Sequence, residues 1–198
     1  MRYGTIALLS ATALALAGCG HKEETSTTTN SVTEQSGSTT VADTNIPDNS
    51  VVAAPVLGAG QAFANAAAAS DAFEIAESQL AATSAHSAAI KSFAKKMVEA
   101  HTGSTAKLKT VAAGLSPAIT PDPTLTPDQQ AKVDALKTKT GADFDTAYAA
   151  DQVAAHQATL DAVRSYSTSG DVPALKTFAT GLIPTVTAHL NMAKGLKP

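Results

Sequence analysis

Three histidines and two glutamates are the residues of this chain that could carry chemistry. Imidazole nitrogens and carboxylate oxygens together bind Zn, Fe, Cu or Ni. Projecting each predicted helix at 100° per residue places at least one of these groups on the apolar face of every long helix. They are Glu74, Glu77, His101, His156 and His189. We therefore expect one helical core to receive an ionisable side chain from each of its walls.

Two interpretations of this cluster stay open, because an ionised group in an apolar core is costly unless it is paired or bound to metal. In the first, three imidazoles and one carboxylate hold a transition metal and leave a position open for chemistry. In the second, the histidines form a buried polar network with Glu74 and with hydroxyls such as Ser70 and Ser104. Burial should lower the pKa of the three histidines in either case, whereas a Glu74 carboxylate that stabilises an imidazolium would reverse this direction. We expect His86, in a turn, to be solvated.

The elements that position these groups are helices, because apolar residues recur at spacings of three and four. The predicted long helices cover residues 60–83, 87–114, 142–168 and 172–196. A proline-rich crossover follows Ser116, and Thr126 begins a capping box that starts a short helix ending near Gly141. Pro184 should kink the last helix. The sequence thus predicts an all-α, ferritin-like antiparallel four-helix bundle, with a long crossover that carries a short extra helix.

The N-terminus indicates export and anchoring. Residues 6–17 are an apolar stretch of twelve residues, which fits a signal peptide and is too short to span a membrane. Leu16-Ala17-Gly18-Cys19 resembles the bacterial lipobox, so 1–18 would be a signal peptide and Cys19 a lipidated first residue. By resemblance to Gram-negative sorting, Gly20 in place of Asp implies the outer membrane, on its periplasmic side. The predicted partner is therefore the membrane, reached through acyl groups.

Composition separates a tether from a globular domain. After Cys19, residues 20–58 hold 13 Ser or Thr among 39, with one basic and five acidic residues, so 19–58 should be a disordered tether. Residues 59–198, the predicted bundle domain, hold 12 basic and 12 acidic residues and offer no basic surface for nucleic acid. The single Cys excludes an internal disulfide and a Cys-based zinc cage.

The same polar positions lie within motifs of a known family. The motifs are Phe73-Glu74-Ile75, then Phe93-Ala94-Lys95-Lys96-Met97-Val98 before His101-Thr102, then His156-Gln157, and Leu182-Ile183-Pro184 before His189-Leu190. Over about 60–196 the chain resembles domain-of-unknown-function family 4142, bacterial envelope proteins with a ferritin-like bundle. The resemblance implies a secreted or lipid-anchored four-helix domain with recurring polar positions at Glu74, His101, His156 and His189. It implies no established reaction.

Two departures bear on the chemistry. The family usually has Asp immediately before the histidine of the second helix, where this chain has Ala100. Di-iron ferritins use Glu-x-x-His on two helices, but Val98 and Val186 stand three residues before His101 and His189. The sequence therefore argues against a carboxylate-bridged di-iron centre.

Three functions remain. We expect a non-enzymatic envelope or stress-related module, since no catalytic signature is recognisable. One alternative is a metal-binding or redox protein that uses Zn, Fe or Cu in the His/Glu cluster. The other is a carrier of a small apolar ligand, held in a cavity between alanine-rich helix faces. The sequence identifies no protein partner.

Overall fold

The described part of the protein, residues 58–198 of a computed structural model, is entirely helical. Five helices and no β-strand occur within it. The helices are α1 (Ala59–Ser84), α2 (Ala88–Ala113), α3 (Pro127–Lys137), α4 (Gly141–Ser169) and α5 (Pro173–Lys194). The predicted fold class is confirmed, and each predicted long helix matches an observed one to within two residues at either end.

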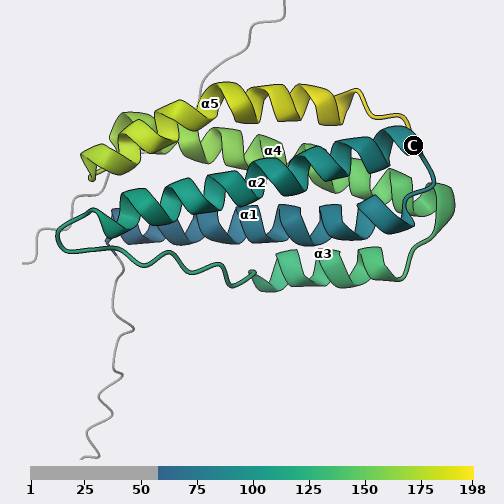
Figure 1. Cartoon of the computed structure of the whole chain (residues 1–198), viewed down its shortest axis with the longest axis horizontal. Coiled ribbons are helices and arrows are strands. Elements are labelled where there is room, and N and C mark those ends of the chain that lie inside the picture. Colours follow the sequence, from purple (N-terminus) through teal and green to yellow (C-terminus); the bar gives the residue numbers. More distant parts are fainter. Residues whose placement is uncertain (1–57) are drawn as a thin grey trace, which may run out of the picture. The chain divides into compact units, whose positions relative to one another are not determined.

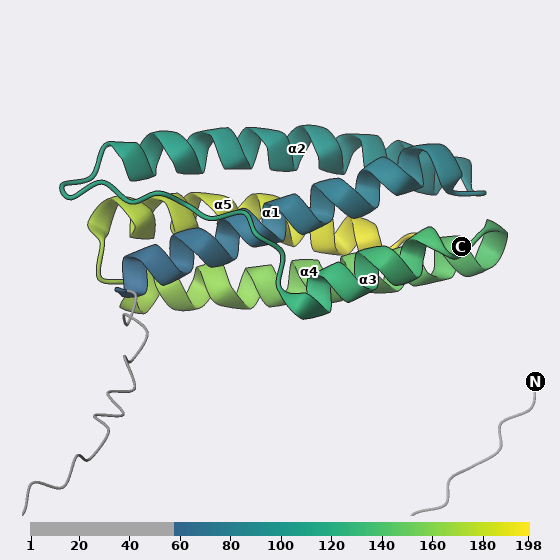
Figure 2. The same ribbon diagram turned by 90° about the horizontal axis from the view of Figure 1, so that it is seen from below.

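The four long helices form two hairpins. α1 packs against α2 and α4 against α5, and the two hairpins meet where α1 contacts α4 and α2 contacts α5 (Figure 1). A long connection follows α2 and leads into α3, which lies against α1 and α4 (Figure 2). This is the connectivity of a ferritin-like bundle with one long crossover.

Local sequence signals explain several helix ends. Thr126 and Gln129 form the predicted capping box, with Pro127 in the first turn of α3. α2 is capped from a distance, because the buried Asp145 carboxylate of α4 accepts from the backbone N–H groups of His86 and Ser87 at 2.9 and 2.7 Å. α5 continues through Pro184. These capping contacts fix where α2 and α3 begin.

The core is two apolar clusters with a polar layer between them. One cluster gathers large side chains near one end of the bundle, including Phe63, Leu160 and Leu175. The other gathers Phe144, Tyr148 and others towards the opposite end. Along every long helix, the buried polar residues lie between positions that belong to the two clusters. They are Asp71, Glu74, Glu77, Ser78, His101, Gln152, His156 and His189, whereas the buried Asp145 lies beside Phe144 of the second cluster.

The apolar face predicted for residues 60–83 is rotated about the helix axis relative to the buried face of α1. We centred that face on Glu77 and included Ala66, but Ala66 is exposed. Glu74 and Ala81 are completely buried, and Asp71 is buried beside them. α1 carries alanine on all its faces, so hydropathy alone distinguishes its sides poorly. The buried face is therefore broad and includes both Glu74 and Glu77.

The predicted signal peptide (1–18), the lipidation site Cys19 and the tether up to residue 57 lie outside the described residues. Among the helices from Ala59 onward, none is both long enough and apolar enough to cross a membrane.

Candidate metal centre

Three histidines from three helices converge in the polar layer. The ring centroids of His101 (α2) and His156 (α4) are 5.6 Å apart, and His189 (α5) lies 5.6 Å from the first and 5.4 Å from the second. One ligand nitrogen from each ring lies within 4.8 Å of the other two. Tetrahedral ligands at ~2.0–2.1 Å from an ion are about 3.3 Å from one another, so the rings need to close by at most about 1.5 Å.

One nitrogen on each ring has no hydrogen-bond partner. These buried atoms are Nε2 of His101, Nε2 of His156 and Nδ1 of His189. The other nitrogen of His101 bonds Asp71 Oδ1 at 2.8 Å, and that of His156 bonds the backbone oxygen of Gln152 at 2.8 Å. Because a carbonyl oxygen only accepts, His156 Nδ1 must carry the proton, and the neutral ring presents a lone pair at Nε2. Metal-binding histidines are commonly oriented in this way.

Glu74 lies directly beside two of the histidines. Its side chain is fully buried, with Oε2 3.6 Å from His101 Nε2 and Oε1 3.4 Å from His156 Nδ1. Neither carboxylate oxygen has a hydrogen-bond partner. Burial raises the pKa of Glu74 to about 7, and the neighbouring His101 opposes that rise. The Glu74 oxygens are not among the converging ligand atoms, but a bound cation would stabilise this carboxylate, so Glu74 is placed to be a counter-charge.

Glu77 belongs to the same layer but not to the histidine group. Only the three histidines form a set of converging ligand atoms in the described part of the chain. Glu77 is buried, and its Oε2 accepts from Gln152 Nε2 at 3.3 Å. Burial raises the pKa of Glu77 to about 8, helped by the negative charge of Asp151. The structure therefore separates Glu77 from the predicted ligand set, while His86 is exposed as expected.

Two residues of the centre were not predicted from the sequence. Asp71 accepts from His101 at one carboxylate oxygen and from Thr105 Oγ1 at the other, 3.1 Å away. Gln152 connects His156 to Glu77 through its backbone oxygen and its side-chain amide. Their spacing was the available signal: Asp71 precedes Glu74 by three residues, and Gln152 precedes His156 by four, which puts each pair on one helix face.

The histidines differ in protonation. Burial lowers the pKa of His156 and of His189 to about 4, as predicted, so both are neutral at pH 7. The prediction was wrong for His101. Burial lowers its pKa too, but the hydrogen bond that His101 donates to Asp71 and the charges of Glu74 and Asp71 together outweigh burial and raise it. Two histidines are thus ready to bind metal, and the third must first release a proton when it is charged.

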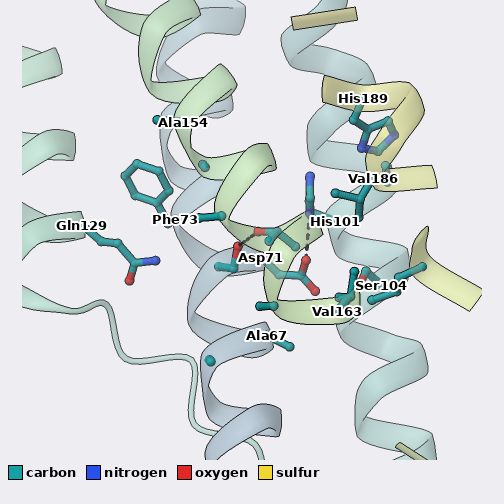
Figure 3. A pocket seen from close by; sticks show the side chains of 18 of the residues that line it. Ala67, Asp71, Phe73, His101, Ser104, Gln129, Ala154, Val163, Val186 and His189 are labelled. Atoms are coloured by element: carbon teal, nitrogen blue, oxygen red, sulfur yellow. Dashed lines mark hydrogen bonds and ion pairs between the residues drawn. The ribbon is translucent and has the colours of Figure 1, made fainter. Parts of the chain in front are cut away.

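Two openings reach the histidines from outside the core. A cavity of about 460 Å³ has His101, His189 and Asp71 in its wall. Figure 3 shows the two histidines on one side of it and Phe73 and Gln129 on the other. A wider groove of about 980 Å³ between α2 and α5 also includes His189. The histidine cluster is therefore buried but accessible.

The fold and the cluster define a helical bundle with a buried three-histidine centre. The family described as "Domain of unknown function (DUF4142)" matches residues 47–196, and the chain belongs to this family. A search of curated proteins found no match. Among solved structures, the chain is similar to one titled "CopM in the Cu(II)-bound form", with a TM-score of 0.58 and 16% identity over 69% of this chain and 93% of that one. At this identity the similarity supports the shared fold.

Proposed function

We propose that this protein binds a divalent transition metal through His101, His156 and His189, with Glu74 as a nearby counter-charge, and that it holds Cu(II) most tightly. One observation carries the proposal: three buried histidines converge, and one nitrogen of each lacks any partner. In a purely structural polar network those nitrogens would be hydrogen-bonded, since a buried unpaired polar atom costs about 1–3 kcal/mol.

The donor set supports the choice of metal. Imidazole suits Cu, Zn, Fe and Ni, and among divalent first-row ions a site of given ligands binds Cu(II) most strongly. The similar solved structure is of a Cu(II)-bound protein, which is consistent with copper in this kind of bundle. Glu74 and Asp71 supply negative charge that would offset the charge of the ion. A di-iron centre is disfavoured, because Glu74 is the only carboxylate between residues 58 and 198 that approaches two of the histidines.

The role we infer is metal binding in the cell envelope rather than catalysis. The lipobox around Cys19 supports lipid anchoring, and Gly20 supports the outer membrane on its periplasmic side. This location is tested by following the full chain and its Cys19→Ser variant after membrane fractionation. We expect the variant to leave the membrane fraction. A variant that fractionates like the unaltered protein would contradict lipid anchoring.

Metal content tests the proposed function. The full chain is purified without chelator or affinity metal, loaded with Cu(II), desalted and measured by elemental mass spectrometry. We expect about one copper per chain, and a loss of at least nine-tenths of it when His101, His156 and His189 are replaced by alanine. His86→Ala is the matched control, because this histidine is exposed and lies in a turn. Equal copper in the triple variant, or no copper, zinc or iron bound by the unaltered chain, would overturn the proposal.

A further inference from the structure

We propose that the cavity beside the three histidines is a binding site for a small, apolar organic molecule that carries one azole-like nitrogen donor and ligates the bound metal through it. This inference rests on the proposed metal site and goes beyond it, because it assigns an exogenous ligand to the ion.

The size and walls of the cavity suit such a molecule. Its volume of about 460 Å³ falls within the range of small-molecule sites, about 300–1,000 Å³. Aromatic and aliphatic side chains form most of its wall, among them Phe63, Phe73, Ala67, Ala155 and Val163. Alanines on α1 and α4 leave the space that larger side chains would fill. The apolar part of a ligand would therefore bind favourably here, because binding removes its surface from water.

The buried polar groups of the cavity wall leave one place for a polar head group. Ser70 Oγ and Thr159 Oγ1 lie 2.8 Å apart in a mutual hydrogen bond. Both oxygens of Asp71 accept hydrogen bonds, from His101 and from Thr105. The buried lining atoms without a partner are nitrogens of His101 and His189. The buried part of the cavity therefore offers a place for a polar head group at the metal.

The orientation of the histidine cluster points to an open coordination position facing the cavity. His101 and His189 belong to the wall, whereas His156 and Glu74 do not. A ligand in the cavity would reach an ion held by all three rings by passing between His101 and His189. A three-histidine site leaves at least one position for an exogenous ligand. Gln129 and Lys132 of α3 line the far part of the cavity and provide a polar rim on the side of α3.

The test compares three probes on the full chain, in the copper-loaded and metal-free forms, by calorimetric titration. 4-Phenylimidazole has both the donor and the apolar body, imidazole has only the donor, and benzyl alcohol has the body without the azole. We expect 4-phenylimidazole to bind the loaded protein about 10- to 50-fold more tightly than imidazole, because burying the phenyl ring adds apolar contact. Benzyl alcohol and the metal-free protein should give at least tenfold weaker binding.

Filling the cavity supplies the structural control. Ala155→Leu and, independently, Ala67→Leu add bulk to the cavity wall. Each should weaken the binding of 4-phenylimidazole at least tenfold and leave the affinity for imidazole unchanged. Ala150→Leu is the matched control, because Ala150 is exposed on the same helix as Ala155 and is not part of the wall. Unchanged imidazole binding in each variant also reports that the fold and the metal centre are intact.

The outcomes separate this inference from the proposed function. Copper bound at one per chain, with 4-phenylimidazole no tighter than imidazole or indifferent to both cavity variants, would overturn the ligand site and leave the metal site standing. Equal binding to the metal-free protein would overturn ligation to the metal, since the cavity would then act as an apolar carrier alone. Failure to bind copper would overturn both.

Discussion

Asp71 Oδ1 accepts a hydrogen bond of 2.8 Å from His101 Nδ1, across the interface between α1 and α2. This contact leaves Nε2 of the ring, which has no hydrogen-bond partner, available to bind an ion. The carboxylate therefore orients the imidazole and, by its negative charge, makes it a stronger donor. Ala100 precedes this histidine in the chain, and Asp71 provides a carboxylate contact to the ring from another helix.

Replacing that carboxylate should weaken metal binding without removing a ligand. We predict that Asp71→Asn lowers Cu(II) affinity about 10- to 100-fold, the usual effect of removing a partner of a metal-binding histidine. Competition with a chelator of known affinity measures the change. Asp161→Asn is the control, because Asp161 is exposed on α4. Equal affinities for the two variants would show that Asp71 does not support the site.

The two glutamates should respond differently to substitution. Glu74→Gln removes the carboxylate that touches two histidines, and we predict at least a tenfold loss of Cu(II) affinity. Glu77→Gln should change that affinity by less than threefold, because Glu77 bonds Gln152 instead. The same chelator competition measures both. A larger effect of Glu77→Gln than of Glu74→Gln would contradict the geometry described above.

The metal-free protein should lose stability as the pH rises from 6.5 to about 8. Glu74 and Glu77 have raised pKa values, about 7 and about 8, so they favour folding below the unfolded pKa of about 4.5 and lose that contribution as the pH rises through the folded values. The raised pKa of His101 acts in the same direction above pH 6.5. His156 and His189 act oppositely, because their lowered pKa values cost stability as the pH falls from 6.5 towards 4.

These opposing contributions to stability determine the pH range of the measurement. Below pH 6.5 the contributions of the glutamates and of His156 and His189 partly cancel. Above pH 6.5, of these five groups, the two glutamates and His101 still titrate. Urea unfolding of the metal-free chain at pH 6.5, 7.25 and 8 should show a decrease in the free energy of unfolding of about 1–3 kcal/mol. Glu77→Gln should reduce that decrease. A free energy of unfolding that increases across this window would contradict the assigned shifts.

Binding of a metal ion should raise the free energy of unfolding and so offset the loss of stability at higher pH. An ion at one hundred times its dissociation constant adds about 2.7 kcal/mol to the folded state, which corresponds to an increase in Tm of about 5–10 °C for a domain of this size. Excess chelator should abolish the increase. The variant without the three histidines should show no increase with Cu(II), whereas His86→Ala should respond like the unaltered chain. A similar increase in the triple variant would place the stabilising ion elsewhere.

The fold was predictable because each helix carries its own signals. The capping box at Thr126 and the three-and-four spacing of apolar residues around His101, His156 and His189 are local features, and they were enough to place all three histidines in one core. The face of α1 was not predictable to the same accuracy. Its alanines lie on all sides, so the prediction centred the apolar face on Glu77 and did not include Asp71.

The contacts inside the polar layer needed three-dimensional information. The hydrogen bond between Asp71 and His101 joins residues 30 positions apart, and the one between Gln152 and Glu77 joins residues 75 apart. The spacing of residues along one helix cannot reveal pairs that join two different helices. The direction that burial alone predicts was wrong for the His101 pKa. A reversal by Glu74 was the alternative, and the contact with Asp71 was not foreseeable.

The most direct test of the metal centre is the X-ray absorption spectrum of the full chain loaded with one equivalent of Cu(II). We expect three imidazole groups bound to copper through nitrogen at about 2.0 Å. Their characteristic scattering should be lost when His101, His156 and His189 are replaced by alanine. A spectrum with no more than one imidazole, or one that is unchanged in the triple variant, would contradict the assignment of these three residues as the ligands.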